Sequence, residues 1–401
     1  MKLPTLGIAG MGIASPIGIG KDEVAAALFA GTRGLIARKD LVPGRAVHVG
    51  QVKATLPAVP SGLELIECGN DRLMLAAVAE IADAVENAAQ RLGHDRIAVV
   101  MGTTTSGIAE GEAAYGIVQR GGVWPADFHY RKQEIGNLGE FVARALNITG
   151  PAYTVATACT SSGKAFASAR RLIAAGRADA AVVGGADTLC RMTVGGFAAL
   201  EAMSSTLCNP FSRNRDGINV GEAAAAFLLT QEPAPIQLLG IGESSDAYHI
   251  SAPDPEGRGA LLAMRAALDD AGLAPADISY VNLHGTGTAL NDSMEGKAVH
   301  TLFGAKTPCS STKALTGHTL GAAAACEAAF LWLTLHPKYN PEGRLPPHVW
   351  DAEVDPLIPP LTLAHVGTRL PNEMGRMAML SNSFAFGGSN IALVLGRGVV
   401  T

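Results

Sequence analysis

The chain has 401 residues, of which 48% are hydrophobic and 17% are charged. This length exceeds a typical single hydrophobic core, and the composition excludes an intrinsically disordered protein. The formal net charge of −5 provides no general attraction to nucleic acid. The nearest candidate for a membrane span, residues 322–335, is short and contains Glu327, so we expect no membrane protein. Glycines interrupt the apolar N-terminus, which argues against a signal peptide and favours a cytoplasmic location.

One order of elements occurs twice along the chain. Each half begins with a glycine-rich hydrophobic strand, followed by an amphipathic helix, a strand ending in a Gly/Thr loop, and later a second hydrophobic strand. The corresponding segments are 6–12 and 238–243, 73–92 and 261–271, 96–105 and 278–286, and 180–185 and 390–396. This alternation is typical of an α/β fold. We therefore expect two similar halves, residues 1–234 and 235–401.

Cys159 is the strongest candidate for a catalytic nucleophile. It lies where a β-prone run, 154–158, changes into a helix of small residues, and this helix has a counterpart after His318. A helix N-terminus favours the thiolate form of a cysteine, so we expect a reactive thiol. The alternative is an inert core cysteine, which is the more frequent role of a single cysteine. The other five cysteines form no C-x-x-C pair, which argues against a disulfide framework and for a reducing compartment.

Two histidines lie in glycine-rich loops downstream of Cys159. His284 follows a predicted strand and precedes Gly-Thr-Gly-Thr, and His318 follows Thr-Gly and precedes a helix. Taken singly, each is more often a hydrogen-bonded structural residue than a catalyst. Together, two neutral imidazoles are suited to donating hydrogen bonds to an enolate oxygen. Because the halves are expected to be equivalent, the Cys159 and His318 loops should meet between them.

The segment 384–390, Phe-Ala-Phe-Gly-Gly-Ser-Asn, is a further candidate element of the site. A glycine turn there could place a backbone N–H beside that of Cys159 to form an oxyanion hole. The alternative is an ordinary hairpin turn. The sequence contains no zinc, EF-hand or Walker motif, and its N-terminal glycines depart from the dinucleotide fingerprint, so we expect neither metal nor cofactor.

The chain resembles the elongating β-ketoacyl-acyl carrier protein synthases in four segments that occur in the same order. They are the segments around Cys159, His284, Lys313 with His318, and Phe384–Asn390. The sequences Arg-Asp-Gly at 215–217 and Gly-Glu at 221–222 also match that family. The resemblance covers essentially the whole chain. It implies the thiolase fold, in which two βαβαβαββ halves form a five-layered α-β-α-β-α body that is usually a homodimer.

The resemblance also implies a role for each matching residue. Cys159 would take the acyl chain, while His284 and His318 would assist decarboxylation of malonyl-carrier protein. Lys313, paired with Glu327, would organise the site. The backbone N–H of Phe386 would complete the oxyanion hole, with Phe384 supporting the turn. The remaining assignments are Thr286 and Thr288, which would contact the phosphopantetheine arm.

Two departures from the family pattern concern the range of substrates. Phe-Ala-Phe at 384–386 replaces the commoner Phe-Gly-Phe, and Cys159 is followed by Thr-Ser-Ser-Gly-Lys. A polyketide or aryl polyene pathway is therefore as plausible as fatty-acid elongation. Other readings are a non-catalytic chain-length-factor-like subunit, which would lack the nucleophile, and a thiolase, which would need a second cysteine near 384–390.

The expected partners are acyl- and malonyl-loaded acyl carrier proteins, with a homodimer or a heterodimer as the assembly. Acyl carrier proteins are acidic, so we expect a local basic patch to receive them. The candidates are Arg131, Lys132, Arg213 and Arg215, although Arg215 could instead be structural through Asp216.

Overall fold

The computed structural model describes residues 3–370 and 377–398. Its strands form one mixed sheet that is narrow in the middle, because β1 and β9 pair only where Leu6 and Gly7 face Leu238 and Gln237. On one side the sheet order is β6 (Ala152–Val155), β5 (Ile97–Gly102), β7 (Ala180–Asp187), β8 (Ala223–Thr230) and β1 (Leu6–Ser15). On the other it is β9 (Ile236–Ser245), β14 (Ser389–Arg397), β13 (Met377–Phe384), β10 (Ile278–Asn282), β11 (Pro308–Ser310) and β12 (Thr362–Leu363).

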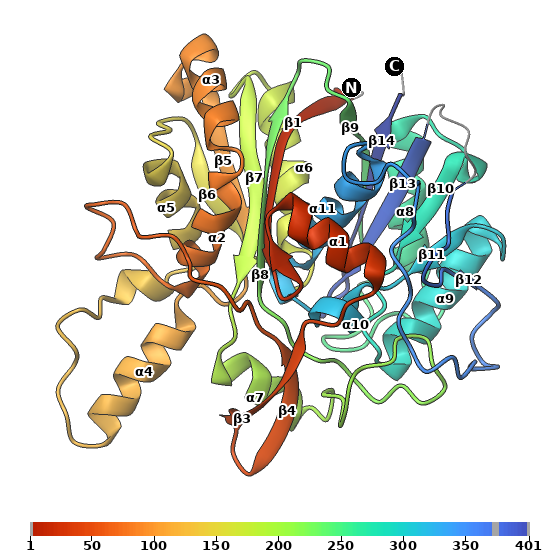
Figure 1. Ribbon diagram of the computed structural model, residues 1–401, viewed down its shortest axis with the longest axis horizontal. Coiled ribbons are helices and arrows are strands. Elements are labelled where there is room, and N and C mark those ends of the chain that lie inside the picture. Colours follow the sequence, from red (N-terminus) through yellow and green to blue (C-terminus); the bar gives the residue numbers. More distant parts are fainter. Residues whose placement is uncertain (1–2, 371–376, 399–401) are drawn as a thin grey trace.

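Helices separate and cover the two parts of the sheet, giving five layers (Figure 1). The central layer consists of α6 (Ser161–Ala174) and α11 (Ala323–Leu335). The outer layers are α2 (Gly69–Ala79), α3 (Ala82–Leu92) and α5 (Asn137–Ala145) on one side, and α8 (Arg258–Ala271) and α9 (Ala289–Phe303) on the other. The expected α/β fold of two similar halves in five layers is confirmed. The proposed boundary between 234 and 235 lies in the link from β8 to β9 and stays a prediction.

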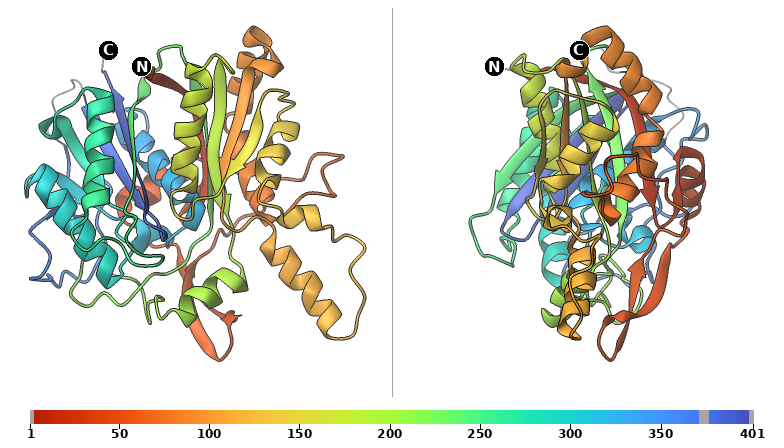
Figure 2. Two further views of the ribbon diagram at one scale, coloured as in Figure 1. Left: turned by 180° about the vertical axis from the view of Figure 1, so that it is seen from behind. Right: turned by 90° about the vertical axis from the view of Figure 1, so that its left-hand side faces the viewer.

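Four further helices and a hairpin lie outside these layers. They are α1 (Lys21–Ala30), α4 (Ile108–Gln119), α7 (Arg191–Ala199), α10 (Lys313–Thr316), and the hairpin of β3 (Leu35–Val42) and β4 (Arg45–Gly50). The two-residue strand β2 (Gly18–Ile19) folds back on β1. Single-turn 3₁₀ helices are η1 (His94–Arg96), η2 (Tyr130–Gln133), η3 (Pro275–Asp277) and η4 (Leu320–Ala322). The helix α4 projects from the body, as the views in Figure 2 show. Among the described residues, no helix is long and apolar enough to cross a membrane.

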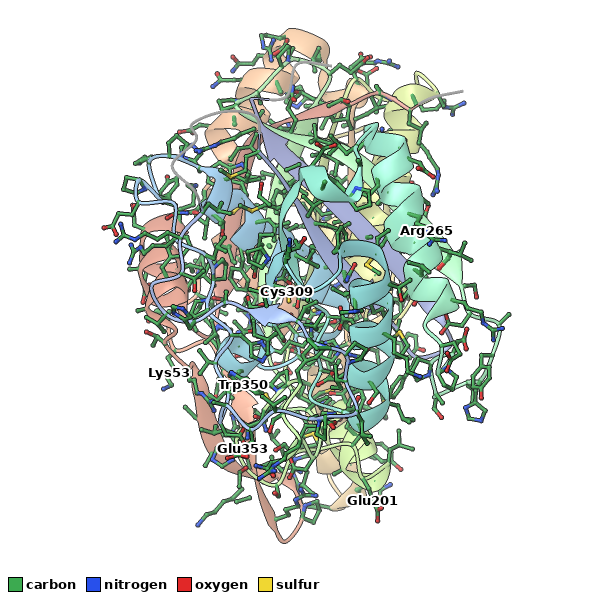
Figure 3. The ribbon with its side chains drawn as sticks, turned by 90° about the vertical axis from the view of Figure 1, so that its right-hand side faces the viewer. Lys53, Glu201, Arg265, Cys309, Trp350 and Glu353 are labelled. Carbon is green, nitrogen blue, oxygen red and sulfur yellow. The ribbon has the colours of Figure 1, made fainter. Side chains whose placement is uncertain are left out.

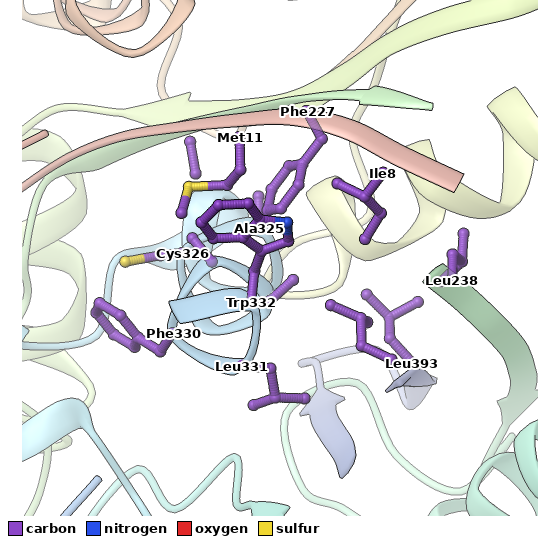
Figure 4. Packing of buried hydrophobic residues seen from close by; sticks show 14 of the residues in the cluster. Ile8, Met11, Phe227, Leu238, Ala325, Cys326, Phe330, Leu331, Trp332 and Leu393 are labelled. Carbon is purple, nitrogen blue, oxygen red and sulfur yellow. The ribbon is translucent and has the colours of Figure 1, made fainter. Parts of the chain in front are cut away.

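The central layer is buried and closely packed. All residues of α11 are buried, and Figure 4 shows Trp332 and Phe330 of this helix among side chains from both parts of the sheet. On α6, a Cβ atom at Gly163 would lie 2.8 Å from Ile391 Cγ2 and 3.1 Å from Ala324 Cβ. The small residues of α6 thus allow both helices to fit between the sheets. One boundary differs from the prediction: the helix expected over 73–92 is interrupted between Ala79 and Ala82.

Candidate active site

The turn before α6 positions the thiol of Cys159. β6 ends at Val155 and α6 begins at Ser161, and Ala158 between them has a φ of 51°, which is uncommon for an L-residue. The Ser161 hydroxyl donates to the Ala158 carbonyl at 2.6 Å and accepts the Thr157 N–H at 2.9 Å. Together these bonds hold a tight strand-to-helix turn with the buried Cys159 near its end.

His318 reaches Cys159 from the second half of the chain. It follows the short helix α10, and its backbone N–H donates to the Asn219 carbonyl at 2.7 Å. Its Nε2 atom lies 3.0 Å from the Cys159 sulfur. Leu320, two residues later, has a φ of 51°, so both halves use a left-handed residue beside the site. The predicted meeting of the two loops is therefore seen in the structure.

His284 completes the cluster from the end of β10. The Glu295 carboxylate of α9 accepts the backbone N–H groups of His284 and Gly285, each at 2.7 Å. The ring centroids of His284 and His318 are 5.2 Å apart, with an interplanar angle of 86°. Phe384 packs edge-on against His284, with centroids 6.0 Å apart. The two imidazoles therefore converge on one point from different loops.

Lys313 lies behind His284 in a buried ion pair. Its Nζ atom is 2.5 Å from Glu327 Oε1 on α11 and 3.3 Å from His284 Nδ1. Because an ammonium group only donates, Nδ1 of His284 must be the acceptor in this contact. The proton of neutral His284 is therefore on Nε2, the nitrogen free to bind a substrate.

Burial determines the protonation states of the site. Burial raises the pKa of Cys159 to about 11, although Lys313 and the backbone N–H groups of Cys159 and Phe386 act to lower it. The expected thiolate is therefore wrong for the resting site, because desolvation outweighs the helix N-terminus. Burial, assisted by Lys313, holds the pKa of both His284 and His318 well below its usual value, so both are neutral. Burial also raises the pKa of Glu327 to about 7.

A cavity of about 390 Å³ leads to these side chains. Cys159, His284 and His318 contribute to its lining, as do Thr286 and Thr288, whose hydroxyl oxygens are 2.9 Å apart. The lining also includes the apolar residues Phe197, Leu200, Leu290, Phe384 and Phe386. The ring of Phe386 packs against that of Phe197, with centroids 5.9 Å apart. One cavity thus holds the thiol, both imidazoles and two hydroxyl groups.

Three buried carboxylates support the loops of the site and were not identified from the sequence. They are Asp187, Asp292 and Glu295. Asp187 accepts hydrogen bonds from the loop after β5 and from the Gly321 N–H of η4. Asp292 accepts the Gly287 N–H, and Glu295 the N–H groups named above. Asp187 ends the apolar run 180–186, and an acidic residue at the end of a buried strand was an available signal.

The four basic residues expected to receive a carrier protein each lie within 4.0 Å of a carboxylate of the same chain. Lys132 is buried. Arg131 pairs with Glu140 at 2.5 Å, and Arg213 with Glu353 at 2.8 Å. The side chain of Arg215 is 7% exposed, and its partner is Asp355 at 2.5 Å instead of the neighbouring Asp216. The side chains of Arg131 and Arg213 stay 40% and 59% exposed, so the basic patch remains a prediction.

The geometry could also suggest a metal site. Ligand atoms of Cys159, His284 and His318 lie within 4.8 Å of one another. However, the Lys313 ammonium contacts His284 Nδ1 and would repel a divalent cation beside it. The arrangement is better suited to acyl chemistry, with a thiol nucleophile and neutral hydrogen-bond donors.

Comparison with known proteins now identifies the family. A β-ketoacyl synthase N-terminal domain matches residues 69–234, and a β-ketoacyl synthase C-terminal domain matches residues 236–344. A 3-oxoacyl-[acyl-carrier-protein] synthase 2 from Coxiella burnetii is 31% identical, over 97% of this chain and 98% of its own. The chain belongs to the β-ketoacyl synthase family. This β-ketoacyl synthase is an acyltransferase, a condensing enzyme of fatty-acid or polyketide synthesis.

Two solved structures are similar to this β-ketoacyl synthase over nearly its whole length. One is a ketosynthase (ApeO) in complex with its chain length factor (ApeC) from Xenorhabdus doucetiae, at 46% identity and a TM-score of 0.93, covering 98% of each chain. The other is the ishigamide ketosynthase/chain length factor, at 28% identity and a TM-score of 0.87, covering 98% of this chain and 99% of that one.

Proposed function

We propose that Cys159 carries the growing acyl chain and that His284 and His318 act on malonyl-carrier protein. The contact of 3.0 Å between the Cys159 sulfur and His318 Nε2, with the His284 ring beside it, carries this proposal. The sulfur attacks the acyl thioester, and the thiol proton ends on the departing carrier thiol. Backbone N–H groups of Cys159 and Phe386, which already face the sulfur, stabilise the oxyanion.

In the second half-reaction, the malonyl carboxylate leaves as CO₂ and its bonding electrons form a thioester enolate. Neutral His284 and His318 donate hydrogen bonds to the enolate oxygen, and Lys313 keeps the His284 proton on Nε2. The enolate carbon attacks the acyl carbon on Cys159, the C–S bond breaks, and the released sulfur takes up a proton from solvent, which restores the thiol. Thr286 and Thr288, which line the cavity, contact the phosphopantetheine arm.

The two half-reactions can be separated by mutation. We expect His284→Ala and His318→Ala to lose at least ~100-fold in CO₂ release from malonyl-carrier protein, because each removes a donor to the enolate. Acylation of Cys159, followed by mass spectrometry, should fall much less. Cys159→Ala should abolish condensation while decarboxylation continues. If the double histidine variant released CO₂ at the parental rate, the histidine roles would be wrong.

We also propose that the enzyme works in a polyketide-type pathway, in the cytoplasm, paired with a chain-length-factor-like subunit. Two observations support the pairing: both similar structures named above contain a ketosynthase and a chain length factor, and β6 ends the described sheet with one unpaired edge. In the same half of the chain, α4 and its loop expose Tyr115, Val123 and Trp124. All six cysteines are unpaired, as in a reducing compartment.

The mass of the purified chain in solution tests the pairing. A chain that requires a different subunit should be monomeric or aggregated alone, and should form a 1:1 complex when co-expressed with a chain-length-factor-like protein. A stable particle of twice 41.1 kDa that condenses substrates alone would instead show a homodimer. The non-catalytic alternative is disfavoured because Cys159, His284 and His318 are all present and assembled.

A further inference from the structure

The helix α7 is weakly anchored by its own residues. Val194 is its one buried residue, and its N-cap residue, Cys190, makes no side-chain capping hydrogen bond. Its interior contains Gly195 and Gly196, and glycine is among the poorest helix formers. The helix lies at the lower end of the molecule, where Figure 3 labels Glu201 just beyond its C-terminus. The position of α7 therefore depends on groups from other elements.

A carboxylate from α4 fixes the first turn of α7. Glu112 accepts the backbone N–H of Arg191 through Oε2 at 2.9 Å and that of Met192 through Oε1 at 2.6 Å. Both N–H groups lie in the first turn of a helix, where an intrahelical acceptor is lacking and the macrodipole favours negative charge. Because both oxygens of one side chain bind this helix end, Glu112 restrains the start of α7 in position and in direction.

The helix α4 can act as a support because its own start is fixed. Asp187 accepts hydrogen bonds from the loop that precedes α4. A Cβ atom at Gly107, the N-cap residue of α4, would lie 2.2 Å from the Lys132 carbonyl oxygen, so α4 begins in close contact with η2. Two anchors therefore hold the turn of α4 from which Glu112 extends.

Near its C-terminus, α7 contacts the turn that completes the oxyanion hole. The ring of Phe197 packs against that of Phe386, with centroids 5.9 Å apart and an interplanar angle of 51°. The backbone N–H of Phe386 faces the Cys159 sulfur. The next two residues, Gly387 and Gly388, have φ angles of 85° and 77°. Glycine restricts the backbone least, so outside contacts such as that with Phe197 help to fix this turn.

We propose that Glu112 is a positioning residue for the oxyanion hole. By holding α7 it keeps Phe197 against Phe386, and this contact keeps the Phe386 N–H directed at Cys159. The inference rests on the proposed function, because that N–H stabilises the oxyanion formed when Cys159 is acylated and again when the enolate attacks. CO₂ release depends on the two histidines instead. Glu112 should therefore affect acylation and condensation and leave decarboxylation unchanged.

The three steps are measured separately, with the enzyme in its functional assembly. Removing an oxyanion donor outright costs about 10²–10³-fold in rate, and displacing it should cost less. We expect Glu112→Ala to slow Cys159 acylation, followed by mass spectrometry, and condensation by roughly tenfold. CO₂ release from malonyl-carrier protein, measured in the Cys159→Ala background, should not change. Glu112→Gln keeps one carbonyl acceptor for α7 and should recover part of the loss. A purely structural role would instead lower all three rates together.

Glu110 provides the matched control. It also lies on α4, and it accepts the N–H of Gly69, the first residue of α2, at 2.8 Å. None of the described residues of α2 lines the active-site cavity. Glu110→Ala should therefore lower the thermal stability by a similar amount to Glu112→Ala, while acylation and condensation keep their parental rates.

A double-mutant cycle tests the route through Phe197. If Glu112 acts through this ring, Phe197→Ala should slow the same two steps, and adding Glu112→Ala should slow them little further. Parental acylation and condensation in Glu112→Ala, an equal loss of CO₂ release, or multiplied losses in the double variant would each overturn the proposal. Wild-type acylation of Cys159 reports separately on the proposed function, because it can succeed even if Glu112 has no effect.

Discussion

At the scale of single residues, Cys159 is held between opposing electrostatic influences. Burial removes water from the sulfur and disfavours its charged form, while Lys313 and two backbone N–H groups favour that form. Burial prevails, and the pKa of about 11 leaves the resting group a thiol at neutral pH. The Nε2 atom of His318, 3.0 Å from the sulfur, lies within hydrogen-bond distance of this thiol.

This balance predicts the pH dependence of Cys159 alkylation. A pKa raised to about 11 means that the thiolate fraction increases throughout the range from pH 7 to 10. The rate of iodoacetamide labelling, followed by mass spectrometry of the Cys159 peptide, should therefore rise about tenfold per pH unit without a plateau. If the labelling rate instead reached a plateau before pH 8, the thiol would already be fully ionised there, and the site would stabilise the thiolate.

At the scale of secondary-structure elements, Asp187 joins the two halves of the site. It ends β7, accepts the backbone N–H groups of Thr104 and Thr105 at 2.8 Å each, and accepts the Gly321 N–H of η4. Gly321 is three residues beyond His318, in the single turn η4 that directly precedes α11. Asp187 thus connects the loop after β5 with the segment that carries His318.

Replacing Asp187 should loosen this connection. Asp187→Ala leaves several buried N–H and hydroxyl groups without an acceptor, so we expect the free energy of unfolding to fall by about 3 kcal/mol in urea titrations. The rate of condensation should fall by a larger factor than the KM for acyl substrate rises, because the position of His318 is disturbed. Asp187→Asn, which keeps a carbonyl acceptor, should recover part of both losses. A stable and fully active Asp187→Ala enzyme would contradict this role.

At the scale of the whole molecule, the close approach of α6 to α11 and β14 holds the two halves together. A Cβ at Gly163 would meet Ile391 and Ala324 at 2.8 and 3.1 Å. Arg170, also on α6, is fully buried, pairs with Asp270 of α8 and donates to the Leu3 and Pro4 carbonyls. The central helix of one half is therefore fastened to the other half and to the N-terminal segment.

A pair of glycine substitutions tests this packing. Gly163→Ala should lower the free energy of unfolding by about 1–3 kcal/mol, because the sheets and helices must separate to accept one methyl group. Gly195→Ala on α7, where a Cβ would have no neighbour within 4 Å, should be neutral or stabilise by up to about 1 kcal/mol. Thermal unfolding of both variants gives the comparison, and equal effects would show that α6 is not tightly packed.

Much of the fold and the site could be predicted from local sequence. The repeated order of strands and helices indicated two α/β halves, since hydrophobic periodicity reflects which face of each element is buried. The small residues after Cys159 and the glycine loops at His284 and His318 are chemical features visible in the chain itself. The pairing of Lys313 with Glu327 came from family resemblance, and the structure shows these two groups in contact.

Other properties depend on contacts between distant segments, which only the tertiary structure decides. The thiol state of Cys159 follows from burial by both halves, whereas the sequence showed only its favourable helix N-terminus. Arg213 and Arg215 pair with Glu353 and Asp355, about 140 residues away, so no local pattern indicated these ion pairs. The local sequence determines the secondary-structure propensity of each segment and which reactive side chains it contains. Solvation and ion pairing are set by what the fold places around each group.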